Sequence, residues 1–100
     1  MYRFTRHATL KYAGDMPSAL QFSSELTLYL NKTYSLNMKS GAEMFGGSRL
    51  YFFYDIESLD AIAQFNAKLM QDRLYLDMLN KAKNLWREGS MQDCVVKIIA

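Results

Sequence analysis

The chain has 100 residues, half of them hydrophobic and 22% charged, and its formal net charge is +2. This composition is typical of a single globular domain and excludes a disordered chain. So small a net charge also argues against a protein that binds nucleic acid or anionic lipid by bulk electrostatics.

The N-terminus and the cysteine content indicate where the protein is located and which bonds and bound groups it can have. Charged residues interrupt every apolar run in residues 1–11, so we read this segment as neither a signal peptide nor a membrane span and expect a cytoplasmic protein. The single cysteine, Cys94, excludes an intramolecular disulfide, and its strand-like surroundings predict a buried thiol. Since the chain also has one histidine, we expect neither a bound metal ion nor a cofactor.

Residues 2–12 alternate between apolar and polar side chains, which predicts a strand with one apolar face. The apolar face carries Phe4, Ala8, Leu10 and Tyr12, and the polar face carries Arg3, Thr5, His7, Thr9 and Lys11. Arg6 breaks the pattern because it falls in the apolar set, and we expect its long side chain to reach out to water.

A first helix is predicted to begin between Asp15 and Ser18 and to end near Tyr34. Asp15 can cap free backbone amides, and Pro17 suits a first helical turn. The expected apolar stripe is Leu20, Phe22, Leu26, Tyr29 and Leu30, with Ser23 among the residues of the solvent side.

Residues 37–56 indicate a β-hairpin, because the paired glycines Gly46 and Gly47 supply the positive φ angles of a tight turn. The second strand is apolar on both faces, with Leu50, Phe52 and Tyr54 on one and Tyr51 and Phe53 on the other. A three-residue loop with a bulge places Met38, Ala42 and Met44 on the face of Leu50, and Lys39, Gly41 and Glu43 on the face of Tyr51. A strand of this kind needs cover on both sides.

A long helical stretch is predicted from the N-cap Ser58 to the stop signal Gly89. Its two apolar stripes are Leu59, Ile62, Phe65 and Leu69, followed by Met70, Leu74, Met78, Ala82 and Leu85. Because the second stripe is displaced by one residue, we expect a bend or break near Asp72 and Arg73. Trp86 is expected to pack on the last turn.

Residues 94–100 predict a last strand, with Val96 and Ile98 on the helix-facing side and Val95, Lys97 and Ile99 opposite. The element order is then β-α-β-β-α-β. With right-handed crossovers it closes into an α+β, ferredoxin-like domain over residues 1–100, a four-stranded antiparallel sheet with both helices on one face.

The sheet face without helices is predicted to carry the functional residues. Its candidates are His7, Thr9, Lys11, Glu43, Tyr51, Phe53 and Lys97. This mixture is too apolar for permanent exposure, so we expect two copies to stack through their open sheets as a homodimer and to enclose a cavity. There His7 can transfer protons, the lysines can neutralise an anion and the aromatic rings can stack on a ligand. Interface hydrogen bonds, cross-strand ion pairs and aromatic packing explain the same residues without a ligand.

The element order, the length and the face pattern resemble the dimeric α+β barrel superfamily, which includes antibiotic biosynthesis monooxygenases, haem-degrading enzymes and NIPSNAP-like proteins. The resemblance implies a homodimer with a cavity between or beside its sheets, and it implies no particular reaction. Haem-degrading members carry a histidine on the second helix. The corresponding stretch here has Asn66, Asn80 and Trp86 but no histidine, which argues against haem degradation.

Three functions remain open at this point. The first is a small, partly apolar or anionic ligand bound at the open face, with a cofactor-independent, monooxygenase-like activity as an extension. The second is a purely structural dimerisation domain. The third is an RNA-recognition-like module, since residues 49–54 weakly resemble the aromatic third strand of that motif. We expect nucleic acid not to be the partner, because the glycines of the motif are missing and the basic charge is thin.

Overall fold

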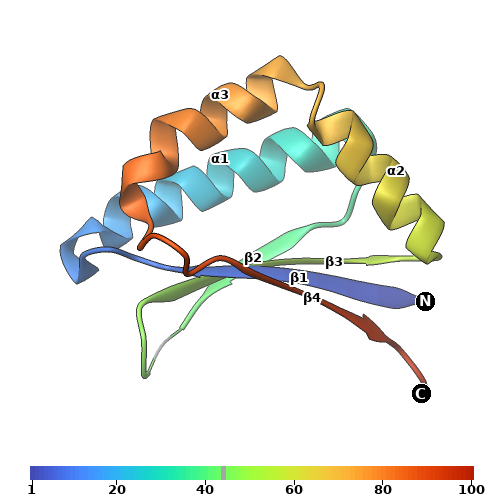
Figure 1. Ribbon diagram of the computed structural model, residues 1–100, viewed down its shortest axis with the longest axis horizontal. Helices are drawn as coiled ribbons and strands as arrows, with labels where there is room; N and C mark the ends of the chain where they lie inside the picture. The colour runs from blue at the N-terminus through green and yellow to red at the C-terminus, as the bar shows by residue number, and fades with distance from the viewer. Residues whose placement is uncertain (44) are drawn as a thin grey trace.

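The computed structural model describes residues 1–43 and 45–100, and the chain forms one sheet covered by helices on one face (Figure 1). Among these residues the strands are β1 (Tyr2–Thr9), β2 (Lys39–Ala42), β3 (Arg49–Ile56) and β4 (Gln92–Lys97). They are antiparallel in the order β2-β3-β1-β4. The helices are α1 (Met16–Tyr34), α2 (Leu59–Leu69) and α3 (Arg73–Ala82), with the short 3-10 turns η1 (Ala13–Asp15) and η2 (Lys83–Leu85). The predicted ferredoxin-like α+β fold is confirmed.

The core lies between the two central strands and the helices. Phe4 and Ala8 of β1 and Leu50, Phe52 and Tyr54 of β3 are buried on the helix side of the sheet. The register pairs Phe4 with Tyr54 and Ala8 with Leu50, so these side chains form one continuous apolar surface. Burial of that surface is the main favourable contribution to folding.

The hairpin has the predicted register. Ala42 pairs with Leu50, and Lys39 pairs with Phe53, so Ala42 and the buried Met38 share the face of Leu50. Met44, predicted on the same face, lies outside the described residues. Gly46 has φ 105°, as the predicted turn requires, but Gly47, predicted to have a positive φ as well, does not.

Helix α1 ends at Tyr34 as predicted, but it is rotated relative to the predicted stripe. Leu20 is 49% exposed, whereas Ser23, predicted on the solvent side, is 4% exposed. Ser23 tolerates burial because its hydroxyl donates to the Ala19 carbonyl at 2.9 Å. Asp15 is the N-cap residue, but its side chain makes no capping hydrogen bond.

The predicted helix break is confirmed at Asp72. Its carboxylate caps α3 by accepting from the Tyr75 N–H at 3.0 Å, and it also accepts from the Tyr29 and Tyr34 hydroxyls of α1, at 2.7 and 2.6 Å. A side chain that bonds to the backbone competes with helix continuation and can end a helix without proline or glycine. At the start of α2, Ser58 accepts from the Ala61 N–H as predicted.

The end of the helical stretch differs from the prediction. Helix α3 stops at Ala82, well before Gly89, and Trp86 is extended rather than helical. Trp86 forms a bridge with Leu10, and the flanking bonds from Lys11 N–H to Leu85 and from Arg87 N–H to Thr9 hold this segment beside the end of β1. Backbone pairing with β1 therefore replaces the last helical turns. In the second apolar stripe Met70 and Leu74 are exposed, and Tyr75 is the buried residue instead.

The predicted faces of β4 are wrong. Arg6 pairs with Asp93 and Phe4 pairs with Val95, which places Val95 and Lys97 on the helix side and Val96 on the open side. Every residue of β4 is exposed, because β4 is an edge strand that the helices do not cover (Figure 1). Cys94, predicted to be buried, is exposed for the same reason. No helix in residues 1–43 and 45–100 is long and apolar enough to span a membrane.

Candidate functional site

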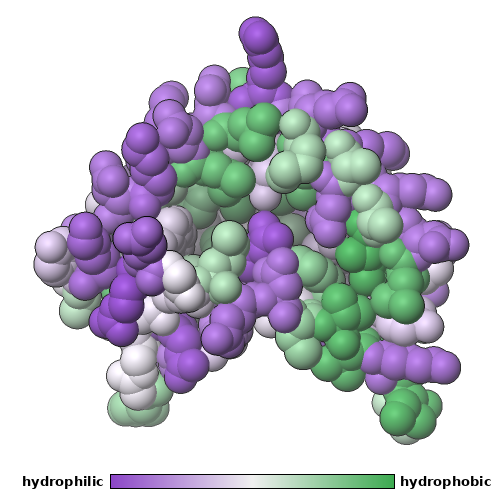
Figure 2. All heavy atoms as spheres, in the orientation of Figure 1, coloured by the Kyte–Doolittle hydropathy of each residue, from purple (hydrophilic) through white to green (hydrophobic). Residues whose placement is uncertain are grey.

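A cavity of about 930 Å³ lies between the helices and the sheet. Figure 2 shows it as a hollow with hydrophobic residues in its walls and hydrophilic residues around it. Its size is that of a small-molecule site. This is not the predicted place, since the cavity was expected at the open face between two stacked sheets.

The cavity exists because the helices cover β1 and β3 but leave β4 open. The sheet supplies the floor with Phe4, Arg6, Ala8, Phe52 and Tyr54. The helices supply the roof with Phe22, Leu26 and Leu30 of α1, Phe65 and Leu69 of α2, and Tyr75 and Leu79 of α3. The α3–β4 connection closes one end with Trp86, whose ring lies 5.9 Å from that of Phe22 in an edge-to-face contact.

Arg6 is the charged residue in this apolar floor. Its Nε and Nη2 donate to the two carboxylate oxygens of Asp93, at 2.7 and 2.8 Å, and its guanidinium carbon lies 5.6 Å from the centre of the Phe4 ring. The Arg6 side chain is 31% exposed. The hydrogen bonds from Arg6 lower the pKa of Asp93, and the pKa of Arg6 is raised by the same bonds. Arg6 keeps part of its surface in solvent, as expected, but its guanidinium is paired with the exposed Asp93 of the neighbouring strand.

Two buried tyrosines adjoin this ion pair. Burial raises the pKa of Tyr54 to about 12, and the charges of Arg6 and Asp93 both act on its hydroxyl. Burial also raises the pKa of Tyr75, while an interaction with Arg6 opposes the shift. Both phenols are therefore protonated at neutral pH and can donate hydrogen bonds. Among the described residues the Tyr54 hydroxyl has no hydrogen-bond partner.

The arrangement can bind an apolar molecule and recognise one oxygen on it. Asp93 occupies Nε and Nη2 of Arg6 and leaves Nη1 with its two hydrogens for another acceptor. A donor beside a protonated phenol in an apolar cavity is a strong site for a carbonyl or hydroxyl oxygen. In residues 1–43 and 45–100 no group of three His, Cys, Asp or Glu side chains is arranged to hold a metal ion.

Most of the predicted site residues lie on the open face and not in this cavity. The register places His7 beside Tyr51, with their rings 5.2 Å apart, and Phe53 beside Thr5. The Nδ1 atom of His7 is buried without a hydrogen-bond partner among the described residues. His7, Tyr51 and Phe53 thus lie next to one another, as the face pattern predicts.

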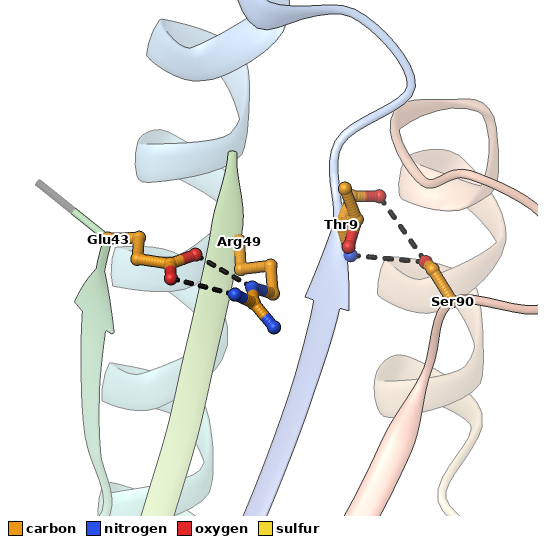
Figure 3. Close-up of polar contacts among 4 residues, drawn as sticks. All are labelled: Thr9, Glu43, Arg49 and Ser90. Atoms are coloured by element: carbon orange, nitrogen blue, oxygen red, sulfur yellow. Dashed lines mark hydrogen bonds and ion pairs between the residues drawn. The ribbon is translucent and has the colours of Figure 1, made fainter. Parts of the chain in front are cut away.

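The remaining predicted residues are used in other ways. Figure 3 shows Glu43 in a paired ion contact with Arg49, at 2.8 and 3.0 Å, and Thr9 bonded through its backbone to the Ser90 hydroxyl. Glu43 therefore makes a cross-strand ion pair, with Arg49 as its partner. Lys11 lines the helix-side cavity, and Lys97 lies on the helix side of β4, so neither is on the open face as predicted.

Arg6, Asp93 and Tyr75 were not among the predicted site residues. The signal for Arg6 is visible, since a charge within the apolar set of a strand needs a partner that compensates for its desolvation. Asp93 could not be assigned as that partner, because its strand register depends on pairing between residues far apart in the chain.

Comparisons with known proteins support the fold. No protein-family model and no curated protein matches the chain. Among solved structures, it is similar to a NIPSNAP family protein of unknown function from Agrobacterium tumefaciens, with 22% identity, a TM-score of 0.83 and coverage of 98% of this chain and 87% of the other. An uncharacterised NIPSNAP domain protein from Burkholderia xenovorans has 14% identity, a TM-score of 0.83 and coverage of 100% and 96%. A putative antibiotic biosynthesis monooxygenase from Deinococcus radiodurans has 8% identity, a TM-score of 0.74 and coverage of 100% and 94%. The resemblance to these groups is confirmed at the level of the fold.

Proposed function

We propose that this protein binds a small, mainly apolar molecule in the cavity between its helices and its sheet. The observation that carries this proposal is Arg6, which lies in the floor of a cavity of about 930 Å³ and is paired with Asp93 at the edge of the sheet. Taking a guanidinium and a carboxylate partly out of water costs free energy, and such a pair contributes little to stability compared with apolar packing. In apolar ligand pockets, a few polar groups of this kind fix the orientation of the ligand.

A cofactor-independent oxygenase activity is the second candidate. It is supported by Arg6 and Tyr75, which are placed to stabilise negative charge on a ligand oxygen. The structural neighbours that are described as antibiotic biosynthesis monooxygenases share the fold at 8% and 10% identity. Oxygen uptake with phenolic probes, present in the wild type and abolished in Arg6→Gln, would support this activity.

We also propose that two copies stack through their open sheet faces. No helix covers this face in the described part of the chain (Figure 1), and it displays Tyr51 and Phe53 near the unpartnered His7 Nδ1, with Val96 farther along the sheet beside Arg3. Its Arg3–Asp55 pair is satisfied within one copy, so stacking would not leave these charges unpaired. Native mass spectrometry of Phe53→Asp tests the dimer, because an aspartate buried there should dissociate it. A Phe53→Asp dimer as stable as the wild type would contradict it.

The ligand site is tested with N-phenyl-1-naphthylamine, a neutral apolar fluorophore whose emission rises in apolar surroundings. We expect saturable binding to the wild type. Leu79→Trp enlarges a side chain that lines the cavity and should weaken binding, whereas Leu76→Trp enlarges an exposed side chain of the same helix and should not. Equal binding by both variants would place the probe elsewhere and contradict the proposal.

A further inference from the structure

Three basic side chains, Lys11, Lys83 and Arg87, line one end of the cavity. The backbone brings them together, because Lys11 N–H donates to Leu85 at 2.8 Å and Arg87 N–H donates to Thr9 at 2.8 Å on either side of the Leu10–Trp86 bridge. Lys83 belongs to η2, directly before this bridge. We call Lys11, Lys83 and Arg87 the basic end of the cavity.

The basic end differs from the arginines of the sheet in its pairing. On the open face each arginine has a carboxylate partner, Arg3 with Asp55 and Arg49 with Glu43, and Arg6 has Asp93. In the described part of the chain no carboxylate lies within 4.0 Å of the charged nitrogens of the basic end. The Lys11 ammonium lies 5.9 Å from the centre of the Tyr12 ring, which brings no negative charge.

The acidic residues near the cavity do not neutralise the positive charge of the basic end. Glu88 is the acidic residue among those that line the cavity. Asp93 forms an ion pair with Arg6 and does not pair with the basic end. A cavity lined by low-dielectric walls and an excess of one charge concentrates ligands of the opposite charge at its mouth.

We infer that the ligand is an organic anion, whose negative group lies at the basic end while its apolar body lies along the aromatic and aliphatic walls of the cavity. This inference rests on the proposed function, since it names the ligand class of the same site. A neutral ligand would bring no counter-charge to the three positive charges of the basic end, and a cationic ligand would add to their repulsion.

The test compares two probes with the same aromatic body. They are 8-anilinonaphthalene-1-sulfonate, an anion, and N-phenyl-1-naphthylamine, its neutral counterpart without the sulfonate. We expect the wild type to bind the anion about tenfold more tightly than the neutral probe, because several partly exposed charge contacts act together. The preference should shrink as ionic strength rises.

Two triple variants test whether the preference for the anionic probe comes from the basic end. Lys11→Gln, Lys83→Gln and Arg87→Gln together remove the basic end. Lys32→Gln, Lys68→Gln and Arg73→Gln together remove the same number and types of charge from exposed positions that do not line the cavity. Both variants take the formal net charge from +2 to −1, so any difference between them reports position rather than total charge. Urea unfolding checks that both are folded.

The outcomes separate the inference from the proposed function. Loss of the anion preference in the cavity triple variant alone supports the inference. Wild-type protein that binds both probes equally, or equal loss in the two triple variants, overturns it and leaves the apolar site standing. Wild-type protein that binds neither probe overturns the proposed function and the inference together.

Discussion

Replacing Tyr54 by phenylalanine should stabilise the unliganded protein. Tyr54 is 2% exposed, and its ring packs against Phe4 at 5.2 Å and Phe65 at 5.5 Å. Its hydroxyl oxygen exposes less than 1 Å² and has no hydrogen-bond partner among the described residues. A polar group buried in this way costs roughly 1–3 kcal/mol. Phenylalanine keeps the ring contacts and removes that cost.

We therefore expect Tyr54→Phe to raise the free energy of unfolding by about 1 kcal/mol, which corresponds to a Tm increase of roughly 5 °C for a domain of this size. The assay is urea and thermal unfolding followed by circular dichroism, without ligand. Equal m-values would show that the mutation acts on stability and not on the extent of unfolding.

Tyr34→Phe is the matched control. The Tyr34 hydroxyl donates to Asp72 at 2.6 Å, and this bond raises the pKa of Tyr34 to about 12. Its removal should lower the free energy of unfolding by about 1 kcal/mol. If Tyr54→Phe destabilised the protein as Tyr34→Phe should, the Tyr54 hydroxyl would have a partner in solution, and the description of this part of the cavity would be refuted.

Two further predictions concern the carboxylates. Asp72→Ala removes the cap of α3 and leaves two tyrosine hydroxyls of α1 without an acceptor. It should lower the free energy of unfolding, measured in urea, by about 2–4 kcal/mol. Asp77→Ala, at an exposed position of the same helix, should lower it by less than about 0.5 kcal/mol. Asp93 has a lowered pKa in the folded protein because of its bonds to Arg6, so its contribution is present at neutral pH and is lost as pH falls from about 4 through the folded pKa. The acid side of the stability curve should therefore be shallower in Asp93→Asn than in the wild type, and parallel curves would rule out the ion pair in solution.

Much of the fold could be predicted because its signals are local. Alternation in residues 2–12, the glycine turn at 46–47 and the one-residue shift between two apolar stripes each depend on neighbours in the chain. They predict the hairpin register and the break at Asp72 correctly, and they place a first strand at residues 2–12, of which β1 covers Tyr2–Thr9. The break is a clear case, since the shift between the stripes is visible in the sequence, whereas the acceptor role of Asp72 is visible only in the structure.

The faces of β4 could not be predicted, for a physical reason. The run Cys94–Ala100 has apolar residues on both faces, so alternation gives no preferred side, and an exposed edge strand has no core contact to impose one. The pairing of Arg6 with Asp93 decides the register, and this information lies in two residues far apart in the chain.

The position of the cavity could not be predicted from the sequence either. A stripe of apolar residues indicates which side of a helix is buried, but it does not indicate whether the helix layer packs against the sheet along its whole length. The space beneath α1 and α3 results from how the helices lie over β1 and β3, and from the backbone pairing that draws Trp86 to the end of β1.

The most direct test of the ligand site is a crystal structure of the protein with N-phenyl-1-naphthylamine bound. We predict density for the probe between the helices and the sheet, bounded by Arg6 on the floor and by Phe22 and Trp86 at the walls. Density for the probe on the open face beside His7 and Tyr51, with the helix-side cavity collapsed or filled by side chains, would contradict the account.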